Sequence, residues 1–235
     1  MEKTGCLICG KELIYLNKPK IITCNYCNKE HETITTCIDG HYICDECHSK
    51  NANELIQKTC EETAEKDPIK IAIRLMKHPI FTMHGPEHHF LVPAVLITAY
   101  YNTINKPYLK KEKLKITRTR SNQILGGFCG SHGSCGAAIG TGIFISIITN
   151  ATPLSKKEWM LSNQITAKTL EKIARYGGPR CCKRNTLLAI YSAVKFANEK
   201  LDTKIKTNGK TICSFNNLNN ECIEEKCPFY PKEKK

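Results

Sequence analysis

The chain has 235 residues, of which 41% are hydrophobic and 24% are charged, a composition typical of a globular protein with one sizeable domain and a small satellite. No apolar run approaches the roughly 18 residues that a membrane helix needs, and the first residues lack the apolar stretch of a signal peptide, so we expect a cytoplasmic protein with no membrane segment. The 15 cysteines are odd in number and include several C-x-x-C pairs. We therefore interpret them as metal ligands, not as disulfides.

The formal net charge is +13, and most of it comes from lysines spread along the chain. The densest basic patch is KKEKLKITRTR, from Lys110 to Arg120. Metal-bound thiolates would lower the net charge, because ligation removes the thiol proton. We interpret the basic excess as a solvated surface, and a nucleic-acid partner is the less favoured alternative.

Residues 1–50 are predicted to form a metal-binding module of short strands and knuckles. Their apolar periodicity is weak, so a core large enough to fold without metal is not expected. CLIC and CNYC give the pattern C-x2-C-x14-C-x2-C, close to the spacing of zinc ribbons. CIDGHYICDECH offers a second set of three thiolates and one imidazole, with His31 and His48 as spare ligands.

Two structural zinc ions are therefore expected in this module. Each ion could take one set, or knuckles from the two sets could share the ions. Closed four-ligand sites have no open position for chemistry, so the module is expected to be structural, and docking of a nucleic acid or protein partner is the alternative. The predicted ligands are Cys6, Cys9, Cys24 and Cys27 in the first set and Cys37, His41, Cys44 and Cys47 in the second.

The remainder is predicted to be mainly α, with a helical domain at residues 51–206 and a cysteine-containing tail at 207–235. Helical spacing begins near Asn51, and Asp67 is expected to cap a helix that has Pro68 at its first position. An apolar helix is expected at 91–105.

Three further helices are predicted after a glycine-rich turn. The segment AAIGTGIFISIIT is apolar on nearly every face, so it should be central and buried. Ser155 and Glu158 form the pattern of a capping box, which predicts a helix that runs to about Arg175. The last helix is expected at 183–200.

Two turns place cysteines at predicted helix starts. FCGSHGSCGAAIG carries Cys129 and Cys135, and YGGPRCCKRN carries Cys181 and Cys182. Free backbone N–H groups at helix N-termini can donate to thiolates, sulfide or an anionic substrate. Two such turns facing each other would suit a cluster held by cysteine sulfur, whereas small buried cysteines in tight turns are the alternative.

The segments LVPAVLITAYYN, GGFCGSHGSCGAAIGTGIFISIITNATP and GGPRCCKRNTLLAIYSAVKFAN resemble, in order and spacing, the catalytic domain of the iron-sulfur L-serine dehydratases and L-cysteine desulfidases. The resemblance covers about residues 84–200. It implies a [4Fe-4S] cluster with Cys129 and Cys181 among its ligands, and Arg184 with Asn185 as the Arg-Asn pair of that family. The whole chain also resembles an uncharacterised family of archaeal and anaerobic bacterial proteins with the same zinc-rich N-terminus.

The third cluster ligand stays open. In the resembling enzymes it comes from a Cys-Asp-Pro turn, where this chain reads IARYGGPR. Cys182 or Cys135 could replace it, as could a cysteine of the tail. The tail cysteines could also ligate a second cluster or bind zinc with Cys60; they are Cys213, Cys222 and Cys227.

The resemblance implies a lyase acting on a small amino or hydroxy acid, in which an open iron serves as Lewis acid while a base removes the α-proton. Arg180 and Arg184 could bind a substrate carboxylate. A non-enzymatic accessory protein that binds a cluster and docks a partner is the first alternative, and an RNA-binding protein is the second. The candidate bases are the loop histidines His84, His88, His89 and His132.

Overall fold

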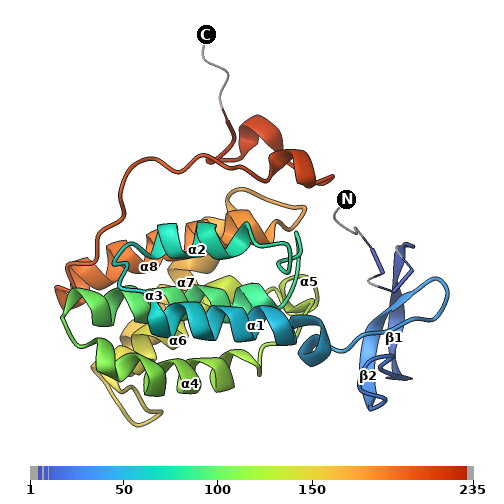
Figure 1. Ribbon diagram of the computed structural model, residues 1–235, viewed down its shortest axis with the longest axis horizontal. Coiled ribbons are helices and arrows are strands. Elements are labelled where there is room, and N and C mark those ends of the chain that lie inside the picture. Colours follow the sequence, from blue (N-terminus) through green and yellow to red (C-terminus); the bar gives the residue numbers. More distant parts are fainter. Residues whose placement is uncertain (1–4, 7, 10, 232–235) are drawn as a thin grey trace. The chain divides into compact units, whose positions relative to one another are not determined.

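The fold is described by a computed structural model that covers residues 5–6, 8–9 and 11–231, apart from the side chain of residue 49. The chain divides into two compact units, Met1–Asn51 and Ala52–Lys235. Within the described residues, one small sheet lies in the first unit and the second unit is built from helices (Figure 1). The predicted fold class, mainly α with a small cysteine-rich module, is confirmed.

The sheet of the first unit is a pair of antiparallel strands, β1 (Leu13–Thr23) and β2 (Glu30–Cys37). Its register shifts between Tyr15 and Lys20, and most side chains of β1 are exposed. The buried side chains described in this unit are Thr36 and four cysteines, namely Cys6, Cys24, Cys37 and Cys44. Sulfur thus occupies the positions that aliphatic side chains fill in an ordinary core.

Helices α2, α4, α6 and α8 pack against α3, in which every residue from Phe90 to Ala99 is buried, and α7 packs against α6 and α8. Gly140 of α6 permits a close approach, because a Cβ at this position would lie 2.7 Å from Cδ of Pro93 in α3. The helices are α1 (Asp45–Glu62), α2 (Pro68–Met76), α3 (Glu87–Thr103), α4 (Lys110–Ser121), α5 (Phe128–Ser131), α6 (Gly136–Thr149), α7 (Lys157–Ala174) and α8 (Cys182–Leu201), with single 3-10 turns η1 (Pro107–Leu109), η2 (Asn216–Leu218) and η3 (Glu224–Lys226).

Several predicted elements differ from the observed ones. The capping box at Ser155 is wrong, because its hydroxyl bonds Thr152 and α7 begins without a side-chain cap. Helix α3 begins at Glu87, four residues before the predicted start, and α1 begins at Asp45, inside the predicted metal-binding module. Helix α4 was not predicted, because its charged sequence hides the helical spacing of its few buried residues.

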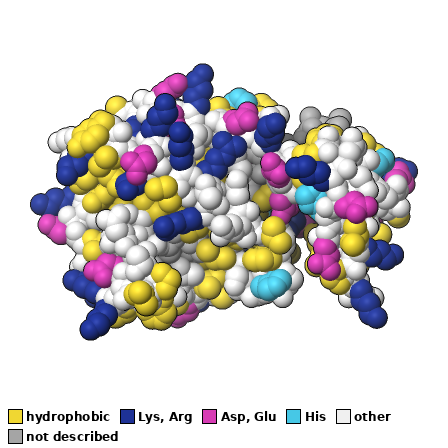
Figure 2. Space-filling view, turned by 90° about the horizontal axis from the view of Figure 1, so that it is seen from below, with side chains coloured by type: hydrophobic (Ala, Val, Ile, Leu, Met, Phe, Trp, Pro, Cys, Tyr) yellow, Lys and Arg dark blue, Asp and Glu magenta, His cyan; other side chains and the backbone are white. Residues whose placement is uncertain are grey.

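The basic excess belongs to the helical unit, since residues 1–51 hold six lysines, no arginine and seven acidic residues. Part of the predicted patch is engaged inside this unit: Lys110 donates to the carbonyl of Thr63 at 2.7 Å, and Arg120 donates to Ser146 at 2.9 Å. On the face shown in Figure 2, Lys and Arg side chains are scattered among acidic and apolar ones. This distribution favours a solvated surface.

No helix in the described ranges combines the length and the apolar character needed to cross a membrane.

The tail after α8 returns along the helical unit and is tied to it at several points (Figure 1). Asp67 caps α2 as predicted, with Oδ1 accepting from the N–H of Ile69 at 2.9 Å, while its Oδ2 accepts from the N–H of Asn208 at 2.8 Å. The hydroxyl groups of Tyr191 and Thr211 lie 2.7 Å apart. One buried carboxylate therefore joins the start of α2 to the start of the tail.

Replacing Asp67 tests this junction. Asp67→Ala should lower the free energy of unfolding by about 1 to 3 kcal/mol, because a helix cap is lost and the N–H of Asn208 in the tail loses its acceptor. Urea unfolding followed by circular dichroism measures the change. Glu199→Ala is the control, since its exposed carboxylate lies 3.8 Å from Lys195 and should contribute less than about 0.5 kcal/mol. Equal effects of both variants would contradict the junction.

Candidate metal centres

The predicted ligands of the first unit gather into two groups of four, and within each group the ligand atoms all lie within 4.8 Å of one another. Each group could hold one metal ion. The groups are Cys6, Cys9, Cys37 and His41, and Cys24, Cys27, Cys44 and Cys47.

The pairing is crossed, because each C-x-x-C knuckle of the first set joins two ligands of the second set. Pairing of Leu13 with Cys37 in the sheet brings the end of β2 back beside the first knuckle. At the other group, the N–H of Cys44 donates to the sulfur of Cys24 at 3.3 Å. Of the two arrangements left open by the sequence, the structure has the crossed one.

The spacing of the sulfurs fits a single ion in each group. The sulfurs of Cys9 and Cys37 lie 3.4 Å apart, and those of Cys27 and Cys44 lie 3.8 Å apart. Four sulfurs placed tetrahedrally around an ion with bonds of about 2.3 Å would be about 3.8 Å from one another. His41 has a buried Nδ1 with no hydrogen-bond partner among the described residues, so its ring suits a ligand position.

The thiols within each group influence one another strongly. Burial acts to raise the pKa of Cys24, but N–H groups of Cys44, Cys27 and Tyr26 donate to its sulfur and lower the pKa to about 6. Burial and the neighbouring thiols raise the pKa of Cys47. One thiolate thus keeps its neighbour protonated, and a cation would be needed to hold all four sulfurs ionised.

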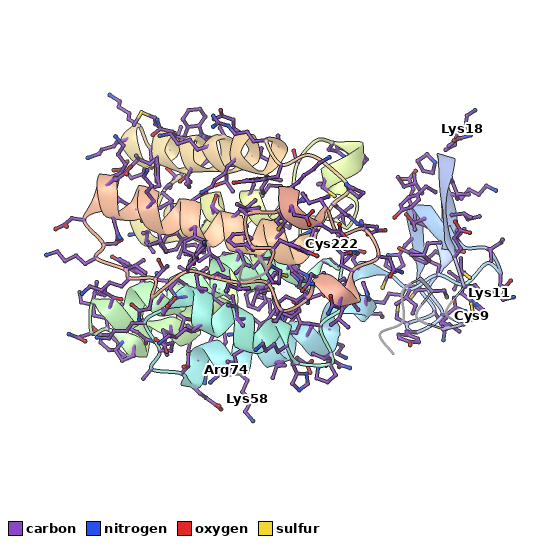
Figure 3. All side chains as sticks on the ribbon, turned by 90° about the horizontal axis from the view of Figure 1, so that it is seen from above. Cys9, Lys11, Lys18, Lys58, Arg74 and Cys222 are labelled. Carbon is purple, nitrogen blue, oxygen red and sulfur yellow. The ribbon has the colours of Figure 1, made fainter. Side chains whose placement is uncertain are left out.

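A second gathering of cysteines lies in the helical unit. Cys181, at the start of α8, and three cysteines of the tail line one hollow of about 400 Å³, which includes its opening to solvent. Figure 3 labels Cys222 on the tail segment of this unit. The tail cysteines are Cys213, Cys222 and Cys227. The rest of the lining is largely apolar and includes Met83, Leu187, Phe215 and Phe229.

The tail holds its cysteines through its own backbone. The N–H of Cys213 donates to the carbonyl of Phe229 at 2.6 Å, and the N–H of Cys227 donates to the carbonyl of Glu224 at 2.7 Å. Burial raises the pKa of Cys181, and the nearby thiols of Cys213 and Cys227 raise it further. These four sulfurs are not among the groups of described residues whose ligand atoms all lie within 4.8 Å. They share one hollow without crowding around a single point.

Arg184 lines the same hollow and is 3% exposed. Its Nη2 donates to the carbonyls of Gly177 at 2.9 Å and Pro179 at 3.2 Å, which fixes the turn before α8. Its Nη1 is buried and has no hydrogen-bond partner among the described residues. A buried donor without an acceptor is costly, so an anionic occupant of the hollow would satisfy it.

The other predicted cluster cysteines lie apart from this hollow. Cys135 caps the start of α6, and the side-chain amide of Asn185 donates to its sulfur at 3.5 Å. Burial raises the pKa of Cys182 to about 12, with Cys135 among the neighbouring groups that raise it further. Cys129 lies in the one-turn helix α5 and acts electrostatically on Cys135. The four predicted cluster cysteines thus divide, with only Cys181 joining the tail.

His84 is the candidate base that contacts the tail. Its Nε2 lies 2.8 Å from a carboxylate oxygen of Glu221 and 3.2 Å from Oδ1 of Asn219, beside Cys222. Burial lowers the pKa of His84, although the charge of Glu221 acts to raise it. These tail partners were not predicted. No local pattern in the sequence links His84 to Asn219 or Glu221, because the contacts join segments far apart in the chain.

The remaining candidate residues are engaged elsewhere. His88 is 1% exposed, with Nδ1 near Gly85 and Glu87, and burial lowers its pKa. His89 Nδ1 lies 3.0 Å from the carbonyl of Ile124. The other two are exposed: His132, whose ring packs on Phe128, and Arg180.

The crossed pairing can be read directly in the cadmium-loaded protein. In a ¹¹³Cd–¹H correlation spectrum, the β-protons of Cys6, Cys9 and Cys37 should couple to one cadmium and those of the other four cysteines to a second. His41→Cys should move the first cadmium signal and leave the second in place, because only one group changes its donor set. Coupling of Cys6 and Cys24 to the same cadmium would contradict the crossed arrangement.

Comparison with known proteins gives a match to a family model. A family model described as a family of unknown function, DUF5714, matches residues 56–230. Neither the curated proteins nor the solved structures give a significant match. The resemblance to serine dehydratases therefore stays a prediction. Since the matched segment is more than half of the sequence and holds the four cysteines of the hollow, the chain belongs to the family of unknown function DUF5714.

Proposed function

We propose that this protein carries a [4Fe-4S] cluster on Cys181, Cys213, Cys222 and Cys227 and uses it for electron transfer, while its N-terminal unit binds two structural zinc ions. The observation that carries the proposal is the hollow in which these four cysteines, from two distant parts of the sequence, meet. Cysteine thiolates are the usual ligands of such clusters.

The spacing of the sulfurs supports a cluster over a single ion. Each cysteine of a [4Fe-4S] site binds a different iron, so the sulfurs stand further apart than around one tetrahedral ion. In both groups of the first unit the ligand atoms all lie within 4.8 Å of one another, whereas the four sulfurs of the hollow do not. The same chain therefore offers two kinds of cysteine site with different spacing.

The charges around the hollow suit an anionic group. A cluster with four thiolate ligands is negative overall, and Arg184 brings a buried Nη1 that has no acceptor among the described residues. Lys183, 1% exposed, has its ammonium 5.1 Å from the ring centre of Phe215, which lines the hollow. Two buried cations next to Cys181 would offset the charge of the cluster.

The chemistry follows from the number of ligands. A cluster held by four cysteines supplies one-electron transfer, because no iron is left open to act as Lewis acid. The chain would set its reduction potential through the buried cations and through the apolar side chains that exclude water, such as Leu187 and Phe229.

Zinc is proposed for the first unit because of its donor sets. Three cysteines with one histidine, and four cysteines, are both common in closed structural zinc sites. The described residues of this unit bury little besides sulfur, so its folding would depend on the metal. We expect docking of a protein partner to be the role of this unit, because closed sites leave no position for a substrate.

A lyase acting on a small amino or hydroxy acid is the second candidate, and the unsatisfied Nη1 of Arg184 favours it. This atom could bind a substrate carboxylate inside the hollow. The candidate requires that one of the four cysteines leaves its iron open. His84, held by Glu221 beside Cys222, would then be the nearest candidate base.

Metal analysis tests the proposed cluster. Protein purified without oxygen should contain iron and acid-labile sulfide, about four of each per chain for a single cluster. Cys213→Ser and Cys227→Ser should each lose most of this iron while keeping zinc in the first unit. Cys60→Ala is the matched control, since this cysteine is fully buried in the helical core and lies away from the hollow. Protein with zinc but no iron, even after reconstitution, would refute the proposal.

The positive charge of Arg184 should affect the reduction potential of the proposed cluster. Arg184→Gln should make the midpoint potential more negative, because the lost cation stabilises the reduced, more negative cluster. Redox titration followed by electron paramagnetic resonance measures this shift. Exposed Arg175 gives the control Arg175→Gln, whose potential should stay that of the original protein. An unchanged potential in the Arg184 variant would show that the guanidinium does not act on the cluster.

Substrate turnover separates the two candidates. Electron transfer predicts that no amino or hydroxy acid yields ammonia, hydrosulfide or a keto acid, and that Cys222→Ser changes the cluster spectrum. The lyase predicts that product release depends on Arg184. It also predicts that the cluster spectrum stays unchanged when the replaced cysteine is the one that does not bind iron. Turnover with a cluster of three cysteine ligands would establish the lyase.

A further inference from the structure

We propose that Cys129 and Cys135 form a redox-active dithiol that takes electrons from the cluster site and reduces small disulfide substrates. The inference rests on the proposed function for its electrons. It gives a role to cysteines that the hollow leaves out, and it assigns a substrate class, namely disulfides that can reach an open glycine-rich turn.

The turn brings the two cysteines together. The N–H of Ser134 donates to the carbonyl of Phe128 at 3.1 Å, so the two ends of the turn are joined by a backbone hydrogen bond. Cys129 directly follows Phe128 in the chain, and Cys135 directly follows Ser134. Gly133 has a φ of +61°, which allows the chain to reverse between them. The thiol of Cys129 also acts electrostatically on that of Cys135.

The two thiols have unequal surroundings, as a dithiol needs. Cys129 is half-buried in α5, between residues 126 and 133 that are half-buried or exposed, so a disulfide can approach it. Cys135 lies at the start of α6, where burial raises its pKa while Ala137, Asn185 and Ala138 donate to its sulfur and act to lower it. Cys129 would attack the substrate, and Cys135 would resolve the mixed disulfide.

Two hydrogen bonds connect this dithiol with the hollow. The backbone N–H of Asn185 donates to the carbonyl of Cys181 at 2.9 Å, one turn earlier in α8. The side-chain amide of the same residue donates to the sulfur of Cys135 at 3.5 Å. Asn185 thus touches a proposed cluster ligand with its backbone and the dithiol with its side chain, which provides a short route for electrons.

The reaction balances as follows. The Cys129 thiolate attacks one sulfur of the substrate disulfide and releases the other as a thiol. Cys135 then attacks the sulfur of Cys129, which releases the second substrate thiol and leaves a Cys129–Cys135 disulfide. Two electrons and two protons restore the dithiol. A cluster bound by Cys181 and the tail cysteines would supply these electrons one at a time, after its reduction by an external one-electron donor.

Peptide mapping tests the dithiol. Cleavage after Arg120 and Lys156 releases one peptide, residues 121–156, which contains Cys129 and Cys135 and no other cysteine. After equilibration of the anaerobic protein with a mixture of reduced and oxidised glutathione, followed by alkylation, this peptide should appear without alkyl groups and lighter by two hydrogens. Cys129→Ser should abolish that species. The inference is wrong if, at every ratio of reduced to oxidised glutathione, both cysteines of this peptide are alkylated or both carry glutathione.

Electron delivery is tested by stopped flow. Reduced cluster should be reoxidised by the oxidised dithiol, and Asn185→Ala should slow this step while the dithiol keeps its midpoint potential. Lys195→Ala, at an exposed position of α8, is the control. If iron is present and the disulfide forms but the cluster is not reoxidised, the electron route is refuted. If the disulfide forms in protein that cannot bind iron, the proposed function fails while the dithiol stands.

Discussion

The anchoring of Arg184 in the turn before α8 is the interaction on which the functional half of the molecule depends. Its guanidinium binds the carbonyls of Gly177 and Pro179, so the chain enters α8 in one fixed geometry. The residues on either side then point in different directions: Cys181 lines the hollow, and Asn185 reaches the sulfur of Cys135. A single buried arginine thereby fixes the turn that lies between both proposed redox sites.

The tail completes this arrangement, since three of the four cysteines of the hollow belong to it. The tail buries Phe215 and Phe229 in the apolar core of the helical unit. It is held by single hydrogen bonds to Asp67, Tyr191 and His84, and by short turns of its own. A bound cluster would add strong bonds between the tail and α8, so cofactor binding and the ordering of the tail would be coupled.

The two units are stabilised in different ways. The helical unit buries a continuous apolar core around α3. The first unit buries mainly sulfur, and its crossed groups tie β1, β2 and the start of α1 together. Crossed ligation would make each ion dependent on the fold around the other, because loss of one ion would free one pair of ligands from each of the two sets. A bound metal ion would there take the place of a core.

Local patterns in the sequence determined much of this protein. Asp67 with Pro68 marks the start of α2, the apolar run after Cys135 marks a buried helix, and C-x-x-C spacing marks the metal ligands of the first unit. These signals act over a few residues, so the sequence displays them directly. Which knuckles share an ion, and which cysteines meet Cys181, depended on contacts between segments far apart in the chain. Such contacts are set by strand register, by the return of the tail and by burial, and only the tertiary structure decided them.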